Sequence, residues 1–174
     1  MDIALVGAGI GGLAAAACLL QQGHTVRVYE QAGEVSEVGA AVQMSANAVK
    51  VLYQLGLKNT LEQHAVKPES FQFLRYDTGE MLHLIVLGDE HEKRHGHPYY
   101  QIHRVDLHQG LLKAVMALDP DAVVLGKRAK SVTEDANQAS VQFEDGTRTQ
   151  AELLIGSDGI KSVVRRHVVD DTPP

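Results

Sequence analysis

The sequence contains a single cysteine, Cys18, among its 174 residues. An internal disulfide is therefore excluded, and so is the Cys-x-x-Cys pair of thiol–disulfide oxidoreductases. Such sparse use of cysteine best fits a reducing, cytoplasmic setting. Cys18 lies in an Ala-Ala-Cys-Leu-Leu run, and we interpret it as a small buried apolar residue of a helix and not as a nucleophile.

Basic residues are also few. Lys and Arg together number 16 against 22 Asp and Glu, which gives a formal net charge of −6 at pH 7. The only local basic runs, Lys127-Arg128 and Arg165-Arg166, are short. No basic stripe is available to neutralise phosphates, so the charge pattern argues against nucleic acid as a partner. The hydrophobic fraction of 44% is that of an ordinary globular chain, and the length suits one domain.

Residues 3–20 carry no charge and could be mistaken for a membrane span. Glycines interrupt this run and strongly lower its helix propensity. The residue before it is Asp2, whereas a signal peptide has Lys or Arg at that place. We therefore predict neither a membrane association nor a secretory leader.

Several motifs of catalysis and metal binding are missing. The sequence has no Gly-x-Ser-x-Gly elbow and no Walker loop. His91, His95 and His97 gather in the polar segment 88–98, where the first two could share a helical face and bind a metal. Because this segment contains Gly96 and Pro98 and no cysteine, we interpret it as a solvated loop and predict no metal site. No catalytic residue is assigned.

The order of the predicted elements is that of an α/β protein. Residues 3–6 form an apolar run that ends at glycine, residues 13–22 are typical of a helix, and residues 25–30 alternate like a strand. Together they have the size of one βαβ unit. Further helices are predicted at 45–55 (capped by Ser45), at 58–65, at 105–118 and from after Gly159 to about 166. Further strands are predicted at 71–76, 81–87, 99–103, 122–125, 130–134, 139–144, 147–152 and 153–155. We expect loops at 33–39 and 88–98 and a polar tail at 170–174.

The most informative local pattern is Gly7-Ala8-Gly9-Ile10-Gly11-Gly12, which matches G-x-G-x-x-G. Gly7 lets the chain turn sharply off the strand, Gly9 lets a pyrophosphate approach the backbone, and Gly12 lets the helix pack close to the strand. The phosphates then meet free N–H groups at the positive end of the helix dipole. The pattern, Gly11 included, predicts a dinucleotide site.

Glu30 ends the second predicted strand, at the distance where dinucleotide sites carry an acidic residue. Its carboxylate can accept both ribose hydroxyls of an adenosine and would repel a 2′-phosphate, which favours FAD or NAD over NADP. Gln31 could reach the ribose or the adenine, or could be an exposed loop residue. A simple NAD dehydrogenase would continue with more strand–helix repeats, whereas an irregular middle and a meander precede Asp158 here.

Three stretches, in this order and spacing, resemble the single-component FAD-dependent aromatic hydroxylases of the salicylate hydroxylase and 6-hydroxynicotinate monooxygenase type. They are the glycine turn with Glu30, the run Ile102-His103-Arg104-Val105-Asp106-Leu107, and the run from Leu153 to Arg165. The most specific part of the third run is Asp-Gly-x-x-Ser-x-x-Arg, from Asp158 to Arg165. The resemblance covers essentially the whole chain. It implies a Rossmann-like FAD-binding fold with a parallel central sheet and a small antiparallel meander, and an enzyme that hydroxylates a small aromatic substrate with NAD(P)H and O₂.

The resemblance also implies roles for individual residues. Asp158 would serve the cofactor pyrophosphate and the nicotinamide donor, although it could equally cap the following helix. Arg104 would bind FAD, although Asp106 could neutralise it instead. The loop 39–43 resembles a Gly-Ala-Gly-Ile stretch beside the flavin, with Ala41 in place of a glycine and Ala46 where proline is common. Gln43 could face the flavin or substrate, or be a plain polar strand residue.

No sequence here matches the family's later glycine–aspartate motif or its large substrate-covering sheet. We therefore expect residues 1–174 to be an incomplete FAD-binding domain, with part of the substrate cover at roughly 66–104. Two other functions stay open from the sequence alone. One is a module that binds FAD or another adenine nucleotide without turnover, and the other is an NAD-linked oxidoreductase.

Overall fold

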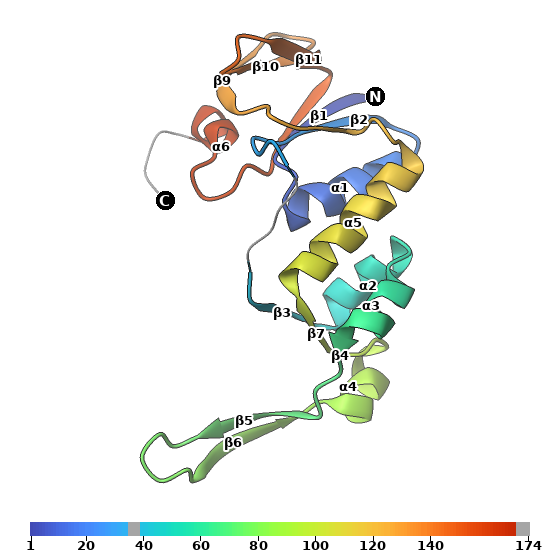
Figure 1. Cartoon of the computed structure of the whole chain (residues 1–174), viewed down its shortest axis with the longest axis vertical. Coiled ribbons are helices and arrows are strands. Elements are labelled where there is room, and N and C mark those ends of the chain that lie inside the picture. Colours follow the sequence, from blue (N-terminus) through green and yellow to red (C-terminus); the bar gives the residue numbers. More distant parts are fainter. Residues whose placement is uncertain (35–38, 170–174) are drawn as a thin grey trace. The chain divides into compact units, whose positions relative to one another are not determined.

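The computed structural model describes residues 1–34 and 39–169 (Figure 1). The chain divides into two compact units. The first unit comprises residues 1–37 and 108–174, and the second comprises residues 38–107. Each unit is described by itself below.

The first unit is built on a parallel sheet of four strands. These are β1 (Asp2–Val6), β2 (Thr25–Tyr29), β8 (Val123–Val124) and β12 (Leu153–Gly156), in the order β12-β1-β2-β8. Val6 lies opposite both Tyr29 and Gly156 in the register. The carboxyl ends of three strands therefore meet at one edge, which is where open α/β sheets bind ligands.

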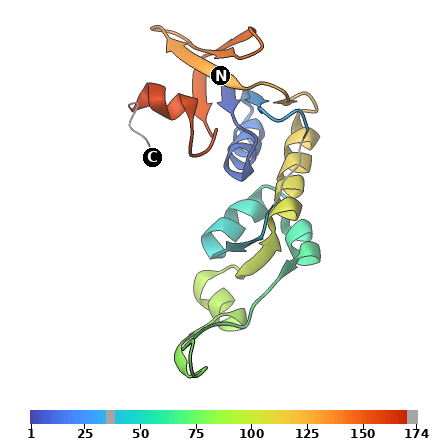
Figure 2. The ribbon, with the colours of Figure 1, turned by 60° about the vertical axis from the view of Figure 1, so that its left-hand side comes forward.

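Helix α1 (Ile10–Gln21) connects β1 to β2 and packs against both strands (Figure 2). Its buried face consists of Gly12, Leu13, Ala16 and Ala17, small residues that allow a close approach to the sheet. Cys18 on the same helix is half-buried and not fully buried as we expected from its sequence context. The long helix α5 (Arg104–Leu118) begins in the second unit and continues into the first.

An antiparallel meander follows β8. It consists of β9 (Ala129–Glu134), β10 (Ala139–Phe143) and β11 (Arg148–Ala151), in the order β11-β10-β9. The chain then returns to the parallel sheet as β12 and continues into the short helix α6 (Val163–Val168). Its buried side chains Val141 and Phe143 form one cluster with Val164 of α6. The rings of Phe143 and Tyr29 lie 5.0 Å apart, so this cluster reaches the end of β2.

The second unit contains a three-stranded antiparallel sheet and three short helices. The strands are β3 (Ala41–Met44), β7 (Tyr100–His103) and β4 (Ala65–Val66), in the order β3-β7-β4, and the helices are α2 (Ala46–Gln54), α3 (Lys58–His64) and α4 (Gly88–His95). Its core is made of large apolar side chains: Val49, Leu52, Leu57, Leu61, Leu87, Tyr100 and Ile102.

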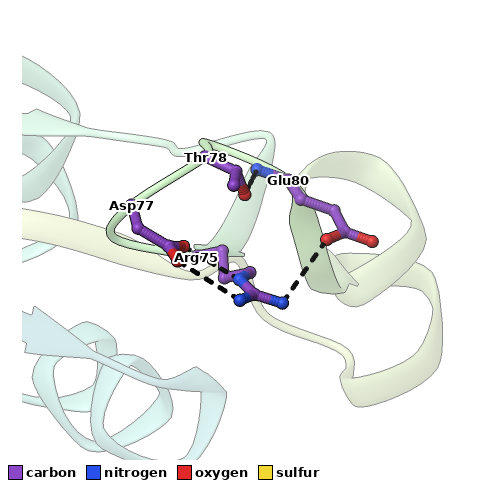
Figure 3. Close-up of polar contacts among 4 residues, drawn as sticks. All are labelled: Arg75, Asp77, Thr78 and Glu80. Atoms are coloured by element: carbon purple, nitrogen blue, oxygen red, sulfur yellow. Dashed lines mark hydrogen bonds and ion pairs between the residues drawn. The ribbon is translucent and has the colours of Figure 1, made fainter.

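A hairpin of β5 (Ser70–Leu74) and β6 (Met81–Val86) belongs to the same unit. Every side chain of β6 is exposed, and a two-stranded hairpin is marginally stable in water by itself. Its turn is closed by charged and polar contacts (Figure 3): Arg75 donates to both carboxylate oxygens of Asp77 at 2.8 and 3.2 Å, and Glu80 N–H donates to Thr78 Oγ1 at 3.3 Å. Gly79 supplies the positive φ of +72° that this turn requires.

The structure confirms the α/β class, the parallel sheet and the meander, and it corrects three local predictions. Residues 88–95 form α4 and not a solvated loop. The acidic Asp89 and Glu90 lie in its first turn and three basic residues in its last, which suits the helix dipole, and Gly96 ends it with φ +79°. Residues 41–43, which belong to the loop predicted at 39–43, instead form β3 together with Met44 and pair with β7.

The third correction concerns Ser45, which is the N-cap residue of α2 but makes no capping hydrogen bond. Its hydroxyl bonds to the side chain of Asn47 instead. Part of the loop predicted at 33–39 and the whole tail at 170–174 lie outside the described residues. Across residues 1–34 and 39–169, no helix has the length and apolar character needed to cross a membrane.

Candidate cofactor site

A cavity of about 610 Å³ opens at the carboxyl edge of the parallel sheet in the first unit. Pockets that hold small-molecule cofactors have volumes of roughly 300–1,000 Å³. Residues that follow three different strands line it together with residues of α5 and α6 and several basic side chains. The lining includes Gly7, Gly9, Glu30, Gln31, His108, Lys127, Asp158, Lys161 and Arg166.

The glycines of the turn after β1 differ in what surrounds them. Gly7 has φ +103°, and a Cβ there would overlap the backbone of Ser157. A Cβ on Gly12 would overlap the carbonyl oxygen of Gly7. These two glycines therefore permit close packing of the turn, as the sequence predicts. A Cβ on Gly9 or Gly11 would meet nothing within 4 Å, so the backbone at Gly9 borders open space in the cavity.

Glu30 follows β2, and its half-buried carboxylate is oriented by backbone donors. One oxygen accepts from the N–H of Ala8 at 2.8 Å and the other from the N–H of Ala32 at 2.9 Å. Because an ionised carboxylate has about four acceptor positions, it retains capacity for ribose hydroxyls. Its neighbour Gln31 is exposed and lines the same cavity.

Asp158 follows β12 and lies in the cavity lining. Its carboxylate accepts from Ser162 Oγ at 2.5 Å and from the N–H of Val163 at 2.6 Å. Ser162 itself accepts from the N–H of Arg165 at 2.8 Å. The capping role that the sequence left open is thus present in the structure, at a residue that also lines the cavity.

The lining mixes both signs of charge, and one of its cations is held in place. Lys127 Nζ lies 2.6 Å from Asp145 Oδ2 and 2.9 Å from Thr147 Oγ1. The Lys127 ammonium group is the main cause that lowers the pKa of Asp145 to about 2, and hydrogen bonds from Thr147 add to it. The lysine is therefore positioned by the meander before any ligand enters.

Two predicted site residues belong to the second unit. Arg104 begins α5, and its N–H donates to the carbonyl oxygen of Ala40 at 3.2 Å. A Cβ on Gly39 would lie 2.9 Å from the Arg104 side chain, so the glycine gives that side chain room. Gln43 is exposed on β3 and accepts a hydrogen bond from the hydroxyl of Tyr99 at 3.1 Å. Their roles toward a cofactor stay predictions.

Sequence reasoning missed His108, which is buried in the lining and lies 2.7 Å from the carbonyl oxygen of Ala8. A signal was present in α5. Leu107, Leu111 and Val115 repeat at helical spacing and are fully buried, and His108 lies beside this apolar stripe as a polar residue on a buried face.

The other histidine cluster gives no metal centre. The rings of His91 and His95 lie 4.4 Å apart on α4. Burial lowers the pKa of His91, and the neighbouring His95 and Arg94 lower it further. Within the described ranges, no three His, Cys, Asp or Glu side chains gather in a way that could hold a metal ion.

Comparison with known proteins identifies this arrangement. Residues 1–171 match the family model described as FAD binding domain. The chain belongs to the FAD binding domain family. The match spans the strand, glycine turn, helix and acidic residue described above and the Asp158 turn.

Among curated relatives of this FAD binding domain, the chain is 42% identical over 171 residues to 3-amino-4-hydroxybenzoate 2-monooxygenase of Streptomyces cremeus, covering 98% of the chain and 43% of the relative. It is 38% identical over 173 residues to 6-hydroxynicotinate 3-monooxygenase of Pseudomonas fluorescens, covering 99% of the chain and 44% of the relative. These relatives confirm the resemblance inferred from the motifs. The chain spans less than half the length of both.

A solved structure gives the same result for the fold. HpxO of Klebsiella pneumoniae, complexed with FAD and uric acid, matches with a TM-score of 0.86 and 32% sequence identity. The match covers 99% of this chain and 43% of HpxO. HpxO is in complex with FAD, in agreement with a family described as FAD binding domain.

Proposed function

We propose that the cavity at the carboxyl edge of the parallel sheet binds the adenosine and pyrophosphate part of FAD. The observation that carries this proposal is one juxtaposition: the open backbone at Gly9 and the oriented carboxylate of Glu30 line the same cavity. In this arrangement Glu30 accepts the ribose hydroxyls, and Gln31 lies beside the ribose or adenine. The pyrophosphate meets the amino-terminal N–H groups of α1.

The basic side chains in the lining suit the charge of a pyrophosphate. Lys161 and Arg166 line the cavity together with Lys127, and cations near a bound phosphate offset its negative charge. Asp158 holds its turn through the cap of α6, so the backbone around Gly159 is fixed beside the cofactor. These residues bind and orient, and no proton transfer is assigned to them.

The reaction we propose is that of an NAD(P)H- and FAD-dependent aromatic monooxygenase. When bound, FAD supplies electron transfer from NAD(P)H and reaction with O₂. The proposal is supported by relatives that are monooxygenases of 3-amino-4-hydroxybenzoate and 6-hydroxynicotinate. A small aromatic acid is therefore the substrate class to test first.

The roles that we propose for the second unit are supported by the family resemblance. Arg104 and Gln43 would serve the flavin side of the cofactor. Residues 66–104 would contribute part of the substrate cover, and residues 1–174 as a whole would be an incomplete FAD-binding domain. These assignments are independent of the adenosine site: they can be wrong while the proposed binding of the adenosine half is right.

A titration tests the cofactor. The purified chain is stripped of ligand and titrated with FAD, and binding is followed by flavin absorbance and fluorescence. We expect saturable binding that ADP competes and that adenosine 2′,5′-bisphosphate competes poorly, because Glu30 faces the ribose. Tight binding of NAD in the absence of any flavin binding would favour an NAD-linked oxidoreductase instead.

A second measurement tests turnover. NAD(P)H oxidation and O₂ uptake are recorded with FAD present, with and without hydroxybenzoates or 6-hydroxynicotinate, and the products are separated by chromatography. Oxidation stimulated by an aromatic acid supports the monooxygenase. FAD binding without stimulation by any of these aromatic acids would indicate a binding module.

A further inference from the structure

His108 lies in the wall of the cofactor cavity without belonging to any motif of the glycine turn. Only 4% of its surface is exposed, and its Nε2 is 2.7 Å from the carbonyl oxygen of Ala8. A carbonyl oxygen can only accept, so His108 must carry its proton on Nε2 and donate it. The histidine on α5 thereby holds a backbone group of the turn after β1.

The hydrogen bond fixes the orientation of one peptide plane. The carbonyl of Ala8 and the N–H of Gly9 belong to the same peptide group, and no peptide bond among the described residues is cis. In a trans peptide the two groups point in opposite directions. Anchoring the carbonyl on His108 therefore aims the N–H of Gly9 away from the histidine.

The other end of Ala8 is anchored as well. Its N–H donates to Glu30 Oε2 at 2.8 Å, and Ala8 is fully buried. Gly9 is the N-cap residue of α1, and its carbonyl accepts the first helical hydrogen bond from Leu13 at 2.9 Å. The N–H of Gly9 is among the groups that a helix leaves without an internal partner. It is the group that a pyrophosphate would use.

We propose that His108 is a positioning residue for the pyrophosphate: it sets the Ala8–Gly9 peptide plane so that the Gly9 N–H is aimed at the phosphate before the cofactor arrives. This inference rests on the proposed FAD site. It adds to that site a residue from α5, far along the chain from the glycine turn. In this proposal the histidine acts through the backbone of the turn, by its contact with the Ala8 carbonyl.

The test uses two substitutions and three ligands. His108→Leu removes the donor and keeps the bulk, whereas His108→Gln retains an N–H donor near the position of Nε2. FAD affinity is measured by titration, and ADP and adenosine are measured as competitors of FAD. Thermal unfolding of each ligand-free variant is recorded in parallel.

For His108→Leu we expect FAD and ADP to bind about tenfold more weakly, since the Ala8 carbonyl loses its partner and the peptide can rotate. Adenosine, which has no phosphate, should bind to His108→Leu as it does to the wild type. His108→Gln should bind FAD and ADP with nearly the wild-type affinity. Equal weakening of adenosine and ADP would overturn the proposal, because that pattern indicates general damage to the cavity. An unchanged affinity for FAD in His108→Leu would overturn it too.

The two hypotheses fail in different ways. A wild-type chain that binds neither FAD nor ADP contradicts the proposed function and the inference with it. Normal wild-type binding with unaltered ligand ratios in the variants contradicts the inference alone. If His108→Leu does not fold, His108→Met supplies the same comparison, because its flexible side chain fills irregular space without a donor.

Discussion

The carboxylate of Glu30 accepts a hydrogen bond from the N–H of Ala8 at 2.8 Å, which joins the end of β2 to the glycine turn after β1. The acidic residue proposed to bind the ribose is thus hydrogen-bonded to the turn proposed to bind the pyrophosphate. Affinity for the cofactor and local stability are therefore coupled at this residue, and experiments have to separate the two.

Replacement of Glu30 by alanine should weaken FAD binding by at least about tenfold, because charged hydrogen bonds to the ribose are lost. The N–H groups of Ala8 and Ala32 lose their acceptor in the same variant, so unfolding should also occur at lower denaturant concentration. Glu30→Gln retains one acceptor oxygen and should recover part of the stability but little of the affinity. Fluorescence titration and urea unfolding measure the two effects, and an unchanged dissociation constant in a folded Glu30→Ala would show that Glu30 stabilises the turn without binding the ribose.

Substitution of two glycines of the same motif should affect different properties, FAD affinity at Gly9 and stability at Gly12. Gly9→Val should keep the fold, since Gly9 has an ordinary φ of −68° and a Cβ there meets nothing within 4 Å, but the side chain would occupy the approach of the pyrophosphate. Gly12→Ala should destabilise the protein, because its Cβ would overlap the carbonyl of Gly7. Thermal unfolding and FAD titration of both variants check this contrast. Full FAD affinity in Gly9→Val would place the nucleotide elsewhere.

Much of the first unit could be predicted from the sequence, because the information is local. The glycine turn, α1 and β2 with Glu30 after it lie within about thirty residues, the size of one βαβ unit, and their spacing is itself the signal. His108 could not be found in that way, because its partner Ala8 is 100 residues distant in sequence. Only the fold brings α5 to the turn.

The sequence analysis predicted a loop where the structure has α4, and the physical reason for this error is different. Helix α4 has no buried residue, so it lacks the apolar periodicity on which helix prediction relies. Its support is electrostatic: acidic residues begin it, basic residues end it, and Arg94 pairs with Glu90 at 3.1 Å. Such interactions are each weak and leave little trace in a hydrophobic pattern.

Acid should loosen the meander beside the cavity. The pKa of Asp145 is lowered from 3.8 to about 2, chiefly by Lys127, so the folded state favours the ionised carboxylate. The resulting stability is present above the unfolded pKa and is lost as the pH falls from about 4 to about 2. Melting temperatures recorded from about pH 5 to about pH 2 should fall in this window, and Asp145→Asn should flatten the slope. The same slope in both proteins would mean that Asp145 contributes nothing.

Asp158 has two roles to separate, since it caps α6 and lines the cavity. Ser162→Ala is the matched control, because Ser162 takes part in the same cap but is not among the residues lining the cavity. Loss of a cap costs about 0.5–2 kcal/mol, so both Asp158→Ala and Ser162→Ala should lower the melting temperature. If Asp158 also organises the cofactor site, only Asp158→Ala should weaken FAD binding beyond the effect of stability, measured well below the melting temperature of both variants. Equal losses of FAD affinity in the two variants would assign Asp158 to the helix cap alone.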